Sequence, residues 1–426
     1  MLVVKQSTKG AIAFVAAFAL LIVAAMWLGR EQADGRTVVT VRLWDKAVAA
    51  AYRTSLDEFE RRHPQIHVDV RVVAYANYAI KLRTDVAGDG ADDLFWVDGT
   101  YFGDYAQAGK LRSVDDALGP GAKTAWAPAV VEQFSRDGTL WAVPQLWDPG
   151  VVLYYNKTLL AKAGVSAQDL AAARWDPDPA RDSFLPLVQK LAERSSWGFG
   201  AFEDLQSTIL PFIGSAGGQL QDGERFVLEN PKTQTALQYV VDLINRWHVA
   251  PSAGDTNINP GFTLEQFLHG KLAIFESGPY NLATIHQNAD FPWGLTAAPA
   301  GPAGRATVAN GVSVALNARS PHPEAAREVL AWLGSAEANA ALGESGAAVP
   351  AVTLATGSWT KHWQDLGVDT EPFFAVPARI PSPRGARFAA AAQAGKPILD
   401  EMFSGRLAVP EAARRYDATA NEVISS

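Results

Sequence analysis

The feature that most restricts the fold of this 426-residue sequence is a change of hydrophobic period between residues 37 and 98. Residues 37–44 alternate apolar and polar side chains, which predicts a strand. Apolar residues then recur at helical spacing as far as Pro64, which ends the helix because the residue before a proline avoids helical geometry. A second strand, a helix over 78–86 and a third strand over 91–98 follow. This alternation predicts an α/β fold with a parallel sheet covered on both faces.

Tryptophan and aspartate occur together where two of these strands end. The first strand ends on Trp44 and Asp45, and the third on Trp96 and Asp98. In open sheets of this kind, ligands bind beyond the carboxyl ends of the strands. In the alternative interpretation, the tryptophans belong to the core and the acids cap the following helices. Because two such pairs fall on the same edge of the sheet, we expect them to line a ligand site.

The length of the chain predicts more than one globular unit, since a single core rarely organises 426 residues. A third pair, Trp147 and Asp148, lies between the predicted strands 138–145 and 150–156. The chain can cross there into a second lobe. Hydrophobic residues make up 48% of the chain and charged residues 19%, as in folded soluble proteins. The net charge of -8 argues against a nucleic acid partner.

The amino-terminal residues 1–32 are predicted to be a signal peptide or an N-terminal membrane anchor. Lys5 and Lys9 precede an uncharged, apolar run over residues 11–28. Such a run lies between a long signal-peptide core and a minimal membrane span of about 20 residues. A buried core helix is the alternative. The positive amino end predicts that the rest of the chain is exported, to the periplasm or to the outer face of the cytoplasmic membrane.

Motifs of enzymes and metal sites are weak in this sequence. It contains no cysteine, which excludes disulfides, thiolate metal sites and lipid attachment through a cysteine. His63 and His67 are separated by Pro64, which rules out the helical metalloprotease arrangement. Aromatic side chains near carboxylates are abundant, and this combination suits a sugar, whose apolar face stacks on a ring while its hydroxyls bond to acids. We therefore expect a binding protein with no catalytic residue, cofactor or metal; a secreted glycoside hydrolase with paired carboxylates is the alternative.

Six segments, in order along the chain, carry a family resemblance: "TSLDEFERRHPQIHVDV", "GDGADDLFWVDGTYFGDYAQAGKLRSVDD", "GTLWAVPQ" with "LYYNKTLLAKAGV", "FLHGKLAIFESGPY", "WGLTAAPAGPAGR" and "HPEAAREVLAWLGS". Together they resemble the extracellular solute-binding proteins of bacterial carbohydrate ABC importers, the maltose-binding-like family, including a mycobacterial member. The resemblance implies a two-lobe periplasmic-binding-protein fold of type II. Each lobe is then a mixed sheet flanked by helices, and a mono- or oligosaccharide is held in the cleft between them. The implied partner is an ABC permease with a cytoplasmic ATPase.

The expected lobes are 37–145 with 312–355, and 146–311 with 356–426. The membrane becomes a further partner where the N-terminal segment is retained. Beside Trp44, the positions that the resemblance assigns to ligand binding are Asp45, Lys46, Trp96, Asp98, Trp147, Asp148, Glu203, Asp204, Tyr280, Asn310 and Arg384. Five of these residues are acidic, and only Lys46 and Arg384 are basic. The set therefore predicts neutral or amino sugars rather than sugar phosphates.

Overall fold

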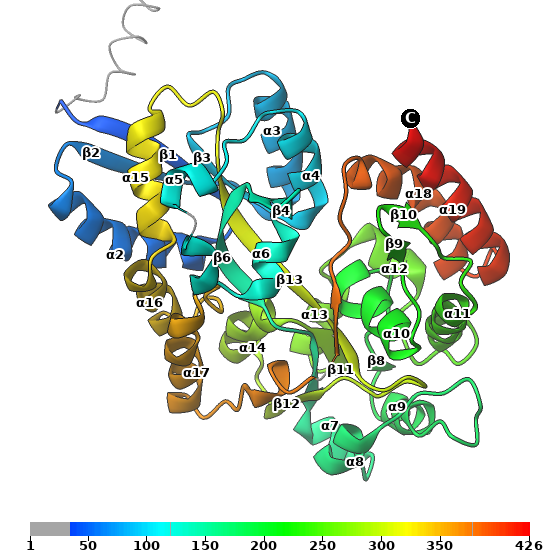
Figure 1. Ribbon diagram of the computed structural model, residues 1–426. Helices are drawn as coiled ribbons and strands as arrows, with labels where there is room; N and C mark the ends of the chain where they lie inside the picture. The colour runs from blue at the N-terminus through cyan, green and yellow to red at the C-terminus, as the bar shows by residue number, and fades with distance from the viewer. Residues whose placement is uncertain (1–34, 120, 377) are drawn as a thin grey trace, which may run out of the picture.

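The computed structural model describes residues 35–119, 121–376 and 378–426. The predicted signal or anchor segment over residues 1–32 lies outside the described residues. Within the described part of the chain, no helix combines the length and hydropathy needed to cross a membrane. Two sheets, each with its own helices, form two lobes, as expected from the sequence (Figure 1). We call them the N-lobe and the C-lobe.

A mixed sheet with the order β14-β13-β3-β1-β2 organises the N-lobe, and β6 pairs with β13 beside this path. The first three strands are parallel, as predicted, whereas β13 runs antiparallel to β3 and β6. The strands are β1 (Thr37–Leu43), β2 (Ile66–Val72), β3 (Leu94–Val97), β6 (Ala142–Asp148), β13 (Ala306–Leu316) and β14 (Ala378–Pro381).

One strand boundary differs from the prediction. Trp147 and Asp148 do not lie in a connection but are the last two residues of β6. They stay in the strand because they pair with Gly311 and Asn310 of β13, in a ladder that continues from one lobe to the other. The crossing therefore consists of paired strands, with one shift of register between Val312 and Ser313. Local sequence patterns at residues 146–149 do not reveal this pairing.

Helices follow the strands of the N-lobe as the hydrophobic period predicts. The first, α2 (Lys46–Arg62), ends immediately before His63 and Pro64, and α3 (Tyr75–Ala87) starts three residues earlier than the predicted helix. The other elements of this lobe are α4 (Gly99–Gln107), α5 (Asp115–Leu118), η1 (Ala122–Ala125), α6 (Pro128–Gln133), β4 (Ser135–Arg136), β5 (Thr139–Leu140), α15 (Pro323–Leu333), α16 (Ala336–Glu344) and η4 (Thr353–Ala355).

The C-lobe contains a four-stranded sheet with the order β12-β7-β11-β8. These strands are β7 (Val152–Asn156), β8 (Trp197–Phe199), β11 (Leu272–Ser277) and β12 (Trp293–Ala297). Around the sheet lie α7 (Lys157–Lys162), α8 (Ala167–Ala172), α9 (Phe184–Ala192), η2 (Leu205–Ile209), α10 (Leu210–Ser215), α11 (Pro231–Asn245), α12 (Ala253–Ile258), α13 (Phe262–Leu268), η3 (Pro279–Asn281), α14 (Leu282–Asn288), α17 (Thr356–Asp365), η5 (Glu371–Phe373), α18 (Phe388–Phe403) and α19 (Val409–Ser425), with a small hairpin of β9 (Gln221–Asp222) and β10 (Arg225–Phe226).

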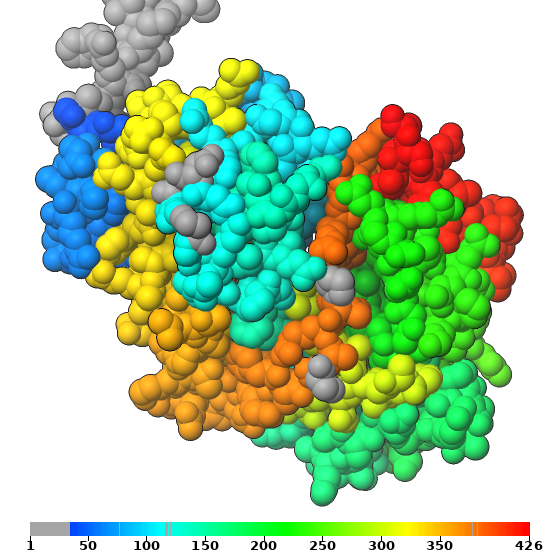
Figure 2. All heavy atoms as spheres, viewed as in Figure 1, coloured from blue at the N-terminus to red at the C-terminus, as the bar shows by residue number. Residues whose placement is uncertain are grey.

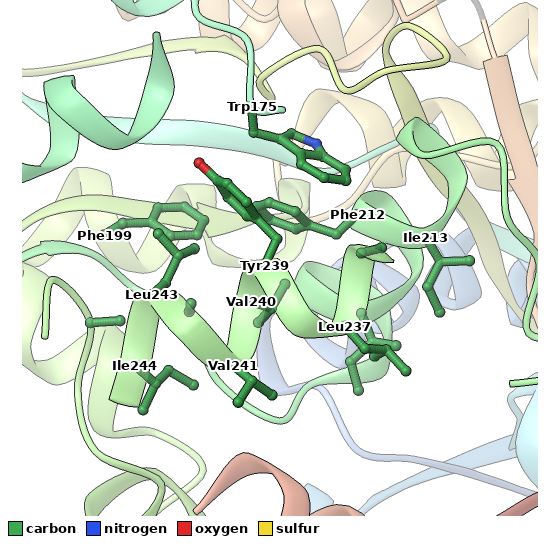
Figure 3. Close-up of a cluster of buried hydrophobic side chains, with 14 of the residues drawn as sticks. Trp175, Phe199, Phe212, Ile213, Leu237, Tyr239, Val240, Val241, Leu243 and Ile244 are labelled. Carbon is green, nitrogen blue, oxygen red and sulfur yellow. The ribbon is translucent and has the colours of Figure 1, made fainter. Parts of the chain in front are cut away.

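Separate hydrophobic cores stabilise the two lobes. The N-lobe core draws its buried residues from 39–143 and 312–355. The main C-lobe core combines residues 151–274 and 388–420 with Val308, and part of it is shown in Figure 3, where Trp175 lies above Tyr239 and Phe212. Figure 2 shows the orange segment that contains β14 between the cyan surface of the N-lobe and the green surface of the C-lobe. A third cluster of buried residues packs the C-lobe sheet against Val349, Trp359 and Trp363.

Candidate functional site

A cleft of about 550 Å³ lies between the two lobes. Its N-lobe wall comes from the carboxyl ends of β1, β2 and β3 and the helices that follow them. Its C-lobe wall comes from the segments after β8 and β11, and the carboxyl end of β6 and the middle of β13 complete it. Eight of the residues expected from the sequence line the cleft: Trp44, Asp45, Trp96, Asp98, Asp148, Asp204, Tyr280 and Asn310. The structure thus brings together positions that are up to 266 residues apart, from Trp44 to Asn310.

On the N-lobe wall, Asp45 and Asp98 both cap a helix and line the cleft. The Asp45 carboxylate accepts hydrogen bonds from the backbone nitrogens of Ala47 (2.7 Å) and Val48 (3.0 Å). Asp98 accepts one from the backbone nitrogen of Thr100 (2.9 Å). Burial raises the pKa of Asp98 above its usual value, which the hydrogen bonds from Thr100 oppose. The capping interpretation of these acids and the ligand-site interpretation are therefore compatible, since the caps fix the carboxylates at the edge of the cleft.

Trp96 differs from its expected role. Its side chain is completely buried, and its indole nitrogen donates to the Tyr52 hydroxyl (3.3 Å). Trp44 packs edge-on against it, with ring centroids 4.6 Å apart. Trp96 therefore supports the floor of the cleft and does not present a free ring face, because the end of β3 is covered by the neighbouring helices.

Tyr75 is a cleft residue that the sequence analysis missed. It is the first residue of α3, its side chain is 69% exposed, and its ring lies edge-on to Trp44 at 5.7 Å. The sequence could have indicated Tyr75 as a cleft residue, because it follows the carboxyl end of β2, on the same edge of the sheet as the two tryptophan–aspartate pairs.

On the C-lobe wall, Asp204 and Tyr280 are both held by local backbone structure. Asp204 caps η2, accepting from the backbone nitrogen and the hydroxyl of Ser207, both at 2.6 Å. Tyr280 follows the Gly278-Pro279 break after β11 and is 43% exposed. A Cβ atom at Gly278 would lie 2.4 Å from the ring of Tyr280, so only glycine permits this ring position.

Asp148 and Asn310 lie where β6 and β13 cross between the lobes, and are paired with each other. Asn310 accepts a hydrogen bond from the Gln133 side chain of the N-lobe (2.8 Å) and donates one to Gln206 of the C-lobe (3.3 Å). Burial raises the pKa of Asp148 to about 7, and a hydrogen bond with Gln206 opposes the shift. This region therefore connects both lobes through polar side chains at the base of the cleft.

Four expected residues do not line the cleft. Lys46 is exposed at the start of α2, and Trp147 packs against Phe374 with centroids 5.9 Å apart. Glu203 pairs with Lys396 (3.5 Å), and burial raises its pKa to about 8. Arg384 instead forms an exposed ion pair with Glu132 (2.8 Å). Lys46, Trp147 and Glu203 are each next to a cleft residue in the sequence. Trp147 points away from Asp148 because successive side chains of a strand lie on opposite faces.

The charge of the cleft follows from these placements. Among the described residues that line it, four are aspartates and none is lysine or arginine: Asp45, Asp98, Asp148 and Asp204. Aromatic side chains from both lobes accompany these acids. No group of three or more histidine, aspartate or glutamate side chains in the described ranges is arranged to hold a metal ion. The arrangement suits a ligand with several hydroxyl groups and an apolar ring face.

A second hollow of about 620 Å³ lies on the C-lobe, where α9 and α11 contribute to its lining. Its walls include Asp182, Tyr239 and Trp247 and come from the C-lobe alone. It has no contribution from the strand ends that converge between the lobes. We therefore place the candidate site in the interlobe cleft.

Comparison with known proteins bears on this geometry. The family profile described as bacterial extracellular solute-binding protein matches residues 43–340. The chain belongs to this family. A probable ABC transporter-binding protein of Deinococcus radiodurans is 27% identical over 63% of this chain, and an arabinooligosaccharide-binding protein of Bacillus subtilis is 23% identical over 52%. The chain spans 63% and 50% of the lengths of these two curated relatives.

Solved structures of solute-binding proteins are similar over almost the whole chain. The UspC protein of Mycobacterium tuberculosis is 46% identical, covering 91% of this chain and 100% of its own, with a TM-score of 0.74. A Listeria monocytogenes substrate-binding protein in complex with cycloalternan is 20% identical, covering 92% and 99%, with a TM-score of 0.79. The expected resemblance to a mycobacterial sugar-importer component and the two-lobe α/β fold are confirmed. The family and these neighbours are substrate-binding proteins, and nothing in the comparisons supports a glycoside hydrolase.

Proposed function

We propose that this solute-binding protein is the extracytoplasmic component of a carbohydrate ABC importer, which captures a sugar between its lobes and delivers it to a permease. The observation that carries the proposal is the acidic, aromatic cleft at the carboxyl ends of the N-lobe strands. Relatives whose names specify arabinooligosaccharide and maltotriose support it. Binding alone is proposed, with no bond made or broken.

Two aromatic side chains are suited to contact the ring faces of the sugar, one from each lobe. Tyr280 is partly exposed on the C-lobe wall, and Trp44 is partly exposed on the N-lobe wall. The aspartates between them are acceptors for hydroxyl groups. We therefore propose that closure of the lobes places the sugar between Tyr280 and Trp44, with Asp148 at the base of the cleft.

The charge of the cleft supports neutral or amino sugars as ligands. Its four aspartates repel a phosphate, and no basic side chain is present in the described lining to offset them. An amino sugar would gain charge-assisted hydrogen bonds from the carboxylates. A neutral sugar would donate its hydroxyl groups to the same oxygens.

The proposal also includes the lobe boundaries, the location of the protein and its permease partner. The lobe boundaries 37–145 with 312–355, and 146–311 with 356–426, are supported by the division of the two main cores. Val349 is an exception, because it lies within 312–355 but packs with buried residues of the C-lobe. Export to the periplasm or to the outer face of the cytoplasmic membrane, with residues 1–32 cleaved or retained as an anchor, accords with the extracellular family. The proposed permease carries a cytoplasmic ATPase.

Titration calorimetry tests the proposed ligand class. The panel comprises glucose, maltose, glucosamine, N-acetylglucosamine and glycerophosphocholine as a phosphodiester. We expect a neutral or amino sugar to bind most tightly, and chromogenic glycosides to remain uncleaved. Tightest binding of the phosphodiester would contradict the charge argument, and turnover of a glycoside would contradict the proposed class of protein.

A further inference from the structure

A smaller cavity of about 290 Å³ adjoins the cleft inside the N-lobe. It lies between α3 and α4, which follow β2 and β3. Four side chains line both this cavity and the cleft, and two of them, Tyr75 and Asp98, stand at the edge where the strands end. The two hollows therefore lie next to each other. We call the smaller one the side pocket.

The walls of the side pocket are mostly apolar, with polar groups at one side. Ala79 and Leu82 contribute from α3, and Tyr101 and Tyr105 contribute from α4. The rings of Tyr101 and Tyr105 are nearly parallel, with centroids 6.4 Å apart. The Asp98 carboxylate belongs to the same lining. An apolar wall faced by aromatic rings, with one carboxylate, is the combination that binds the two faces and the hydroxyl edge of a sugar ring.

The hydroxyl of Tyr105 gives a second and independent indication of a ligand. Tyr105 is 6% exposed, and its hydroxyl is buried with no hydrogen-bond partner. In contrast, the neighbouring Tyr78 hydroxyl donates to the carbonyl oxygen of Trp96 (2.9 Å). Buried polar groups in folded proteins nearly always have a partner, because an unmade hydrogen bond is costly. A hydroxyl group of a bound ligand would supply the missing partner.

We propose that the side pocket is a subsite for a second pyranose ring, so that the preferred ligand is a disaccharide or longer saccharide with one ring in the cleft and the next between α3 and α4. This inference rests on the proposed sugar-binding function. The size of the side pocket supports a single ring, since pockets that hold whole drug-sized ligands begin at about 300 Å³. The exposed ring of Tyr75 marks the boundary between the two subsites.

The test compares monosaccharides with their disaccharides on the full-length protein and three variants. Calorimetry is performed with glucose and maltose, and with N-acetylglucosamine and N,N′-diacetylchitobiose. Ala79→Phe fills the side pocket from a position that does not itself line the cleft. Tyr105→Phe removes the unpartnered hydroxyl and keeps the ring. Ile80→Phe is the matched control, because Ile80 is the next residue of α3 but is 63% exposed and does not line the side pocket.

We expect one disaccharide to bind at least about tenfold more tightly than its monosaccharide, as two filled subsites require. Ala79→Phe should reduce its affinity to that of the monosaccharide, and Tyr105→Phe should weaken it by about 3- to 10-fold. Monosaccharide affinity should not change in either variant, and Ile80→Phe should behave as the unaltered protein.

Equal affinity for both members of each pair, or an Ala79→Phe variant that still binds the disaccharide normally, would overturn the side-pocket inference and leave the proposed function intact. Failure of all four sugars to bind would overturn the proposed function, and the inference with it. Thermal unfolding of each variant shows that it is folded, so that a loss of affinity for both sugars in Tyr105→Phe counts against a subsite.

Discussion

Replacement of Tyr280 by alanine should weaken sugar binding without unfolding the protein. Tyr280 is 43% exposed in the cleft, and a tyrosine side chain presents about 150–250 Å² of surface in total. A sugar that covers the exposed part therefore removes about 65–110 Å² from water. At about 25 cal/mol per Å² this surface is worth about 1.6–2.7 kcal/mol, which corresponds to an affinity loss of about 15- to 100-fold.

Calorimetric titration of the sugar that binds most tightly measures this loss, and Tyr280→Phe is the matched control. Phenylalanine retains the ring face, so its affinity should stay within a few-fold of the unaltered protein. Circular dichroism and thermal unfolding should show a native fold for both variants, because the removed ring is partly exposed. Unchanged affinity of a folded Tyr280→Ala variant would refute the stacking argument, and loss of the fold would show that the ring is part of the core.

The other predictions concern the core, the base of the cleft and lobe motion. Trp96→Ala should lower the free energy of unfolding by about 3–5 kcal/mol in urea titrations, because it removes a completely buried ring; a loss of affinity with unchanged stability would contradict its placement under the floor. Burial raises the pKa of Asp148 to about 7, so the native state retains a proton that the unfolded chain releases above about pH 4, and stability falls as the pH rises until about pH 7. Asp148→Asn removes this effect, and its stability relative to the unaltered protein should rise by about 1–3 kcal/mol between pH 5 and pH 8; a pH-independent difference would be evidence against the raised pKa. Small-angle scattering should give a smaller radius of gyration with saturating sugar, and an unchanged radius despite binding would count against closure.

Much of the fold was predictable because local patterns specify it. The α15 helix shows such a pattern, since a proline stands in its first turn and Gly334 follows its last residue. The β-α-β-α-β order of the N-lobe followed from the change of period between residues 37 and 98. The crossing at Trp147 and Asp148 was not predictable, because these residues remain in β6 only through pairing with a strand more than 160 residues later.

The candidate site was partly predictable for a similar reason. The rule that ligands bind at strand ends located Trp44, Asp45 and Asp98, which all line the cleft. The same rule applied to β2 would have found Tyr75. The rule could not show that the side chain of Trp96 is buried, because this depends on helices packed over the end of β3. It also could not show that Arg384 lies outside the cleft, because its partner Glu132 is 252 residues away.

Hydrogen exchange with and without saturating sugar tests the central claim most directly, because protection of backbone amides locates the bound ligand and the segments that it orders. The account predicts that protection increases together on both walls of the cleft, at residues 44–48 and 98–101 of the N-lobe and at 204–207 and 278–281 of the C-lobe. Protection confined to one lobe, or centred on the C-lobe hollow around residues 176–186 and 231–247, would contradict a sugar bound between the lobes.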